Sequence, residues 1–453
     1  MGGSHAHGGS HDHLDLPATQ ARRARIVLGA LTGLLLVATL VGLVALWPSS
    51  ADRPERTSLL APGVELISAT VTSVPSGEAP AEAVEISAEV SSGDDAGLTI
   101  PVEVPPEVAG SGLEAGDRLR VMSVVPVDEN GEVIEDESLG GGVSYYYFDH
   151  DRSLPLLLLF LVYLVVVALV ARGRGLRAVV GLSAGVAVVV WFMLPALLAG
   201  TEPMLVAIVG SAAMMFPAVY FAHGVSIRTT TALLGTFGGL ALTVLLAMAG
   251  ADPAGMTGAE GDSAAMLYGA DPGLSLSGVF IAGVVVSALG ALNDVTITQA
   301  SSVWELRAAM PGASRRRLFT AAMRIGRDHI ASTVYTLAYA YIGAALPLLL
   351  IASTIDRSLL ATLVSGEISA EVFRTLVASI GLVLTIPLTT GIAAILAGSA
   401  DGGTADAGAE EASMRERAAT RVTGRRRHSS RTRPVAEISP EDEGPEPSPT
   451  AER

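Results

Sequence analysis

Small and polar side chains interrupt an apolar stretch between residues 283 and 305. They are spaced three or four residues apart, so a helix would place them on one face: Gly283, Ser287, Gly290, Asp294, Thr298, Ser301 and Glu305. A carboxylate inside a membrane helix costs about 2.5–3.5 kcal/mol on insertion scales. We therefore expect Asp294 to face protein or water, and the small residues beside it to admit a neighbouring helix.

A second polar stripe follows on the next apolar stretch, where Asp328, Ser332 and Tyr335 are four and three residues apart. A helix start with an ion pair to an arginine explains Asp328 equally well, because a carboxylate in the first turn favours the helix dipole. We predict that both stripes line a substrate or ion path. Its residues are Asn293, Asp294, Thr298, Ser301, Asp328, Ser332 and Tyr335.

Arginines near these stripes are candidates for ion pairs. Arg324 and Arg327 are expected to pair with Asp294, Glu305 or Asp328 across the helices. Glu371 and Arg374 are three residues apart, so they are placed to pair with each other or across the last helix.

The composition is that of a multipass membrane protein, with 50% hydrophobic and 16% charged residues. The absence of cysteine excludes disulfides and thiolate metal sites. The net charge of −16 is concentrated over residues 51–153, which does not favour a nucleic-acid partner. Nucleotide-binding, zinc-protease and serine-nucleophile motifs are absent, so we expect no enzyme, cofactor or metal centre. The histidines between residues 5 and 13 favour a polar tail over a weak metal site.

Five regions follow from the apolar runs and the composition. We predict a disordered tail over 1–25, a first membrane helix over 26–47, a β domain over 51–153, a seven-helix membrane domain over 154–398, and a disordered tail over 399–453. The seven further spans are predicted over 154–170, 178–199, 204–222, 229–249, 274–302, 328–354 and 375–396.

The arginines orient these eight predicted helices. Most arginines in the short loops fall on one side, which the positive-inside rule assigns to the cytoplasm of a plasma-membrane protein. Both termini are then cytoplasmic and residues 51–153 extracytoplasmic. The segment 315–323 is expected to lie as an amphipathic piece at the membrane surface.

Residues 51–153 contain short alternating runs separated by Gly, Pro and Asp, which predict a small β-barrel or sandwich. Acidic residues alternate with Val and Ile along these runs. This pattern favours ordinary solubilising charge over a cation-collecting or partner-docking surface.

Several local motifs are similar to those of one family. They are an RGLR turn at 174–177, ALGALND at 288–294, IGRD at 325–328, EVFRTLVASIG at 371–381 followed by Pro387, and YYYFDHDR at 145–152. On these motifs the chain resembles the YibE/F family of bacterial membrane proteins over about residues 60–398. The resemblance implies the membrane architecture rather than a particular reaction. Asn293 departs from the pattern, where Met or a similar residue is expected beside the aspartate.

Two functions remain open. The first is a secondary transporter or channel-like permease with a polar path around Asp294, its solute unspecified. The second is a non-transporting membrane scaffold whose acidic outer domain docks a partner. A homodimer or a complex with a related membrane subunit fits either hypothesis, because small-residue faces favour helix association.

Overall fold

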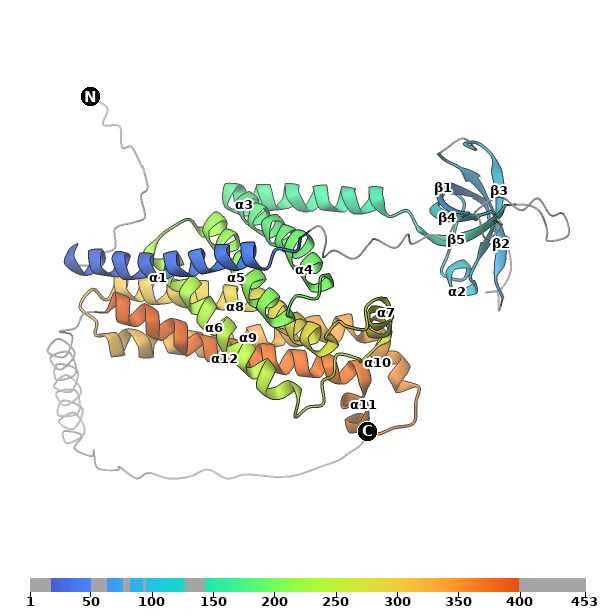
Figure 1. The fold of residues 1–453 in the computed structure, drawn as a ribbon. Coiled ribbons are helices and arrows are strands. Elements are labelled where there is room, and N and C mark those ends of the chain that lie inside the picture. Colours follow the sequence, from blue (N-terminus) through green and yellow to red (C-terminus); the bar gives the residue numbers. More distant parts are fainter. Residues whose placement is uncertain are drawn as a thin grey trace, which may run out of the picture.

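The computed structural model describes residues 18–49, 63–75, 82–92, 95–125, 127 and 143–398. The predicted tails, including the histidines between residues 5 and 13, fall almost wholly outside these ranges. A small β-barrel lies at one end of a helical bundle (Figure 1). The multi-helix membrane architecture, with a β domain between the first helix and the next, is thereby confirmed.

The barrel contains five strands, and each corresponds to a predicted alternating run. Strands β1 and β2 form a hairpin, β3 follows β2, and the order β1-β2-β3-β5-β4 closes on itself, with β3 and β5 parallel. Of the two predicted architectures, the structure is therefore the barrel; Greek-key barrels of five strands include the OB-fold. The strands are β1 (Val64–Ser73), β2 (Val84–Val90), β3 (Thr99–Val104), β4 (Arg118–Val124) and β5 (Ser144–His150), with the short helix α2 (Pro106–Ala109) after β3.

Alternation along the strands explains why the barrel closes. Ile86, Val102 and Leu119 point inward and are at most 1% exposed. Glu85 and Glu103 are cross-strand partners on the outer face of β2 and β3. Like charges directly opposite each other are unfavourable, so this face depends on water to screen them.

Six helices within the described residues are long and apolar enough to cross a membrane, or seven if the bent pair α9 and α10 counts as one span. The helices of the bundle are α1 (Ala18–Ala45), α3 (Ser153–Val188), a π-helical turn (Val189–Met193), α4 (Leu194–Leu198), α5 (Pro203–His223), α6 (Ile227–Ala251), α7 (Asp262–Ala270), α8 (Leu276–Ala309), α9 (Arg315–Ala344), α10 (Leu346–Ser353), α11 (Leu359–Leu363) and α12 (Gly366–Ala397).

We predicted eight spans, one more than the count of seven that includes the bent pair. The difference arises because two predicted spans fall within the single segment Ser153–Leu198. The chain bends sharply in this segment at Arg172, whose φ is 54°. A Cβ on Gly175 would lie 2.6 Å from the side chain of Val167, whereas eight residues of straight helix span about 12 Å. The segment thus folds back on itself near the predicted RGLR turn (Figure 1).

Three helix boundaries differ from the sequence predictions. Helix α1 begins at Ala18 rather than at residue 26, because its arginines are good helix formers and continue the apolar helix. The segment 315–323 is not separate but forms the start of α9. The predicted span 328–354 is broken between α9 and α10 by a 63° bend, next to Pro347, which lacks an amide N–H and cannot continue the helix.

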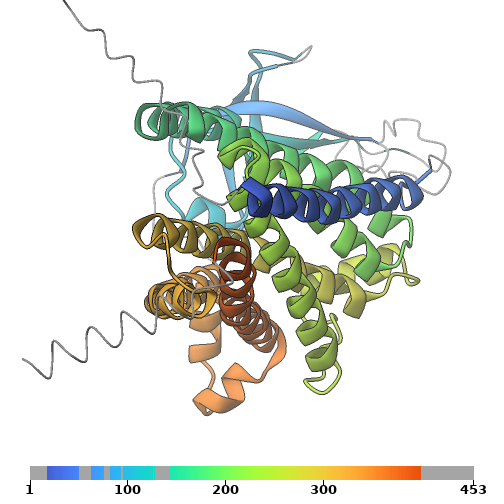
Figure 2. The ribbon, with the colours of Figure 1, turned by 90° about the vertical axis from the view of Figure 1, so that its left-hand side faces the viewer.

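The core of the bundle is the contact between α6, α8 and α12. Cβ atoms added to Gly235 and Gly239 of α6 would overlap Thr389 and Thr385 of α12. The two glycines therefore let α6 and α12 pack closely. Helix α1 crosses the outside of the bundle over α5 and α6 (Figure 2).

Candidate functional site

Asp294 lies deep within the membrane-spanning part of the bundle. The depth of Asp294 along the bundle follows from a hydrogen bond of 2.7 Å between the hydroxyls of Thr236 on α6 and Thr296 on α8. Thr236 is nine residues from the start of α6 at Ile227, about 13 Å along the axis, and Asp294 is about 3 Å further from that end. Helix α6 is about 37 Å long on the same rise, so Asp294 is far from both of its ends.

The carboxylate of Asp294 faces out of the bundle, with 69% of its side chain exposed. Gly283 and Gly290 share this face, and a Cβ on either would meet no atom within 4 Å. The expected close approach of another helix is therefore absent among the described residues. We call this open surface of α8, from Gly283 to Glu305, the Asp294 face.

One side chain of a neighbouring helix reaches the carboxylate. His329 on α9 places Nε2 3.9 Å from Asp294 Oδ2, and this nitrogen is buried without a hydrogen-bond partner among the described residues. The distance suits an ion pair with protonated histidine and is too long for a direct hydrogen bond. A proton added to His329 would therefore bring opposite charges together at membrane depth.

Further charged groups lie between this pair and one end of the bundle. His223 ends α5 and lies within electrostatic range of Asp294, Arg228 and Arg174. These groups come from α3, α5, α6 and α8, so the fold gathers ionisable side chains that are far apart in sequence. We call this end of the bundle the arginine end.

The structure separates the two predicted stripes. Asp328, Ser332 and Tyr335 are exposed on the side of α9 away from its buried residues, and the rings of Tyr335 and Tyr339 lie 6.3 Å apart there. Thr298 and Ser301 are half-buried beside Asp294, and Asn293 has a buried Oδ1 without a partner among the described residues.

The predicted ion pairs have different outcomes. Among the described residues, Arg324 and Arg327 form no ion pair with Asp294, Glu305 or Asp328. The two arginines, Glu305 and Asp328 are exposed, and Asp294 lies near His329 instead. By contrast, Arg374 donates a hydrogen bond of 2.8 Å to Glu371.

Sequence reasoning missed His329, although a signal for it exists. Ala322, Gly326, His329 and Thr333 follow at spacings of four, three and four, which defines the bundle-facing side of α9. Asp328 is only one residue away but about 100° around the helix. The predicted stripe therefore lies on the exposed side of α9, whereas His329 lies on the side that faces the bundle.

A buried polar seam between α6, α8 and α12 was also missed. Thr390 donates a hydrogen bond of 2.9 Å to Gln299 Oε1, and Thr236 pairs with Thr296. Gln299 is fully buried, and its Nε2 has no partner among the described residues. The seam fixes how the three helices meet, because a buried amide requires its hydrogen bond.

A second polar centre lies at the opposite end of the bundle. A cavity of about 450 Å³ between α7, α8, α10 and α12 is lined by Glu260, Glu367, Glu371 and Arg374, together with apolar side chains. The guanidinium of Arg374 also lies 5.8 Å from the ring centre of Phe280. Burial raises the pKa of Glu260, but hydrogen bonds from the backbone and the hydroxyl of Thr257 outweigh burial and lower it.

The junction between barrel and bundle has its own charge network. A hydrogen bond from Arg152 lowers the pKa of Asp149, and bonds from the side chain and backbone of Ser153 lower that of Asp151. Burial raises the pKa of Tyr147, whose hydroxyl lies 2.7 Å from His150 Nδ1. These bonds hold the start of α3 against the end of β5.

Within the described residues, no group of three or more His, Asp or Glu is placed to hold a metal ion. Comparison with known proteins gives one relationship. No curated protein and no solved structure is significantly similar to the chain. The sequence profile of the YibE/F-like protein family matches residues 159–399, which is more than half of the chain and contains α5 to α12 in full. This multipass membrane protein therefore belongs to the YibE/F-like family.

Proposed function

We propose that this chain is a membrane permease, either a secondary transporter or channel-like, in which the Asp294 face lines the path. The observation that carries the proposal is a carboxylate at membrane depth, 69% exposed, with an imidazole nitrogen 3.9 Å away. A carboxylate that met only acyl chains there would be costly, so water or another protein surface meets it. Paired Asp and His side chains at membrane depth are typical of proton relays.

In this proposal Asp294 and His329 exchange a proton or bind a cation together. When both side chains are neutral, their attraction is weak and a solute can pass between them. When both are charged, they attract each other across 3.9 Å and close the path. His223, within electrostatic range of Asp294, supplies a second titratable group towards the arginine end. The pair therefore couples occupancy of the path to protonation.

The described chain does not enclose the Asp294 face, so a further surface completes the path. The uncovered Gly283 and Gly290 suit close approach of a helix from a second copy or from a related membrane subunit. The distribution of arginines supports cytoplasmic termini and an extracytoplasmic barrel. The bend of α3, the turn between α5 and α6 and the end of α8 lie on the side of the bundle opposite the barrel (Figure 1), and by sequence these segments hold Arg174, Arg228 and Arg307.

The second candidate is a non-transporting scaffold, and the same open face favours it. In that case Gly283, Gly290 and Asp294 form only a helix contact with another subunit, while the acidic outer face of the barrel docks a partner. Replacing Asp294 would then lower assembly or stability and would change no flux.

The absence of cysteine makes a direct test of the path practical. Single cysteines at Gly290 and Thr298 would flank Asp294 and leave its carboxylate intact. Leu384 on α12 is the matched control: it is 42% exposed and, from the bond between Thr390 and Gln299, lies at the depth of residue 293. We expect a charged, membrane-impermeant thiosulfonate to label Gly290→Cys and Thr298→Cys but not Leu384→Cys.

A flux measurement then separates the two candidates. Purified protein in liposomes with an internal pH dye would be driven by a potassium diffusion potential. We expect proton entry above that of empty liposomes for the wild type, and entry at the empty level for Asp294→Asn and His329→Gln. Labelling of Gly290→Cys no greater than that of Leu384→Cys, together with unchanged flux in Asp294→Asn, would refute the permease. If the wild type shows no flux and Asp294→Asn loses assembly, the scaffold is supported.

A further inference from the structure

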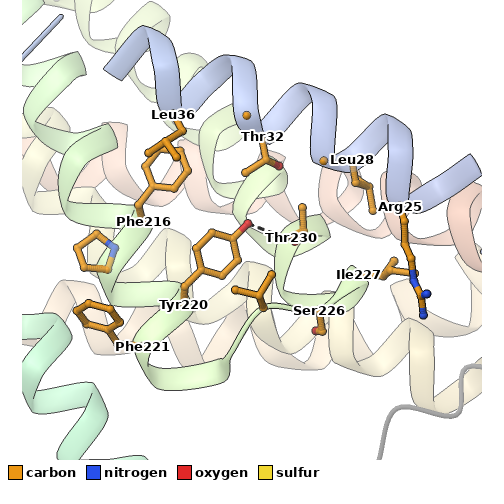
Figure 3. Close-up of a pocket in the computed structure, with 14 residues that line it drawn as sticks. Arg25, Leu28, Thr32, Leu36, Phe216, Tyr220, Phe221, Ser226, Ile227 and Thr230 are labelled. Carbon is orange, nitrogen blue, oxygen red and sulfur yellow. Dashed lines mark hydrogen bonds between the residues drawn. The ribbon is translucent and has the colours of Figure 1, made fainter. Parts of the chain in front are cut away.

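A groove between α1 and the α5–α6 hairpin belongs to neither site above. Its volume is about 820 Å³. Figure 3 shows α1 forming one wall, with Leu36 and Phe216 at one end and Arg25 at the other. The Asp294 face lies on a different helix, so the groove needs its own explanation.

Two glycines create this groove. Gly29 and Gly33 line its α1 wall, and a Cβ on either would meet no atom within 4 Å. From Arg25 to Leu36 the wall is about 16 Å long at the helical rise. The hydrocarbon core of a bilayer is about 30 Å thick, so the groove has the depth of one leaflet.

The chemistry of the groove changes along its length. Arg25 is its only charged lining residue, and none of the described residues that line it is acidic. Ser226, at the start of α6, lies at the same end. Towards Leu36 the walls are apolar, and the ring of Phe216 lies beside Leu36 (Figure 3).

One polar side chain within the groove has no partner in the described chain. Thr32 is 8% exposed, and its hydroxyl is buried without a hydrogen bond. Thr39, two turns further along α1, instead donates to the carbonyl of Leu35 at 2.7 Å. The hydroxyl of Tyr220 is satisfied by Thr230 at 3.2 Å. The hydroxyl of Thr32 is thus left without a partner among the described residues, at the wall of a mostly apolar groove.

We propose that this groove binds one anionic phospholipid from the leaflet at the arginine end. Its phosphate lies beside Arg25, an ester carbonyl accepts the hydrogen bond of Thr32, and one acyl chain runs past Gly33 to Leu36 and Phe216. The single cation selects an anionic headgroup, and the one-leaflet depth selects an acyl chain over a spanning helix. The bound lipid fills the space that α1 leaves against α5 and α6.

The test uses purified full-length protein, stripped of lipid in detergent and titrated with dioleoyl phosphatidylglycerol or dioleoyl phosphatidylcholine, with native mass spectrometry counting bound lipid. We expect one tight phosphatidylglycerol in the wild type. Gly33→Leu should abolish it by filling the groove, and Arg25→Gln should weaken it about fivefold, the usual contribution of one arginine at an anionic headgroup. Arg23→Gln, which removes the same charge outside the groove, should change nothing.

The leucine variants are expected to fold. Leucine favours a helix more than glycine, and the added side chain meets open space at Gly33. Gly29→Leu repeats the test from the adjacent turn. Full retention of phosphatidylglycerol by both leucine variants would overturn the proposal. Equal binding of the two phospholipids, unaffected by Arg25→Gln, would overturn its anionic headgroup.

Discussion

The contact between Gly239 of α6 and Thr385 of α12 gives a sharp test of the bundle core. A Cβ on Gly239 would overlap the hydroxyl of Thr385 and lie 2.8 Å from its Cγ2 and 3.1 Å from its Cβ. Thr385 is fully buried, and its hydroxyl donates to the carbonyl of Gly381 at 2.7 Å. Moving this buried side chain aside would break its hydrogen bond to Gly381, so we expect the helices themselves to separate.

The expected cost of Gly239→Ala follows from two opposing effects. Overpacking a buried contact costs about 1–3 kcal/mol, and the overlap with three atoms of a fixed side chain places this contact at the upper end. Replacing glycine by alanine in a helix returns about 1 kcal/mol. We expect a net loss of about 2 kcal/mol in the free energy of unfolding. Gly290→Ala on the open face, with no overlap, should be neutral or stabilising.

A double-mutant cycle checks the cause. Thr385→Ala removes the hydroxyl and the methyl group that block the new Cβ, so the double variant should recover most of the loss caused by Gly239→Ala. The measurement is unfolding of the purified protein in one detergent, followed by thermal melting and by denaturant. The reasoning is refuted if Gly239→Ala is as stable as the wild type, or if the two losses simply add.

Three further predictions concern single groups. Arg172→Gly should stabilise the protein by about 1 kcal/mol in an unfolding measurement, because Arg172 has a φ of 54° and a ψ of −145°, a region that favours glycine. Glu371→Gln should lower the melting temperature, because it leaves Arg374, whose Nε already lacks a partner among the described residues, without a counter-charge; removing both charges should cost less. The pKa of Glu260 is lowered by its bonds with Thr257, so its stabilising contribution is present at neutral pH and lost as the pH falls through that lowered pKa. The melting temperatures of wild type and Glu260→Gln should therefore converge in acid.

Local patterns in the sequence were sufficient to predict the barrel strands. In β3, Ile100, Val102 and Val104 alternate with exposed residues, and a period of two has only one structural meaning. The choice between a barrel and a sandwich was not predictable, because it depends on β5 lying between β3 and β4 across a long sequence separation. In α6, the spacing of Gly235 and Gly239 places them on one face whatever that face meets.

Membrane helix boundaries were less predictable because hydropathy marks apolar content rather than where a helix ends. Residues 315–323 carry three consecutive arginines, and hydropathy alone separates them from the apolar run that follows. The backbone has no reason to stop there: Ser314 accepts a hydrogen bond from the amide of Arg317 and caps the helix start. The first break comes only at Pro347, where an amide N–H is missing.

Helical periodicity identifies which residues share a face but not what that face meets. Asp294 and Gln299 are five residues apart, so they point about 140° from each other around α8. The Gln299 side is closed by Thr390 of α12, whereas on the Asp294 side the described residues place His329 3.9 Å from the carboxylate and leave 69% of that side chain exposed. The exposed carboxylate and the buried amide impose different requirements on the membrane, since the amide oxygen accepts a hydrogen bond from Thr390 whereas the Asp294 side chain is 69% exposed. The Asp294 face therefore requires water or a second subunit to cover it. Single-cysteine labelling at Gly290 distinguishes water from a second subunit.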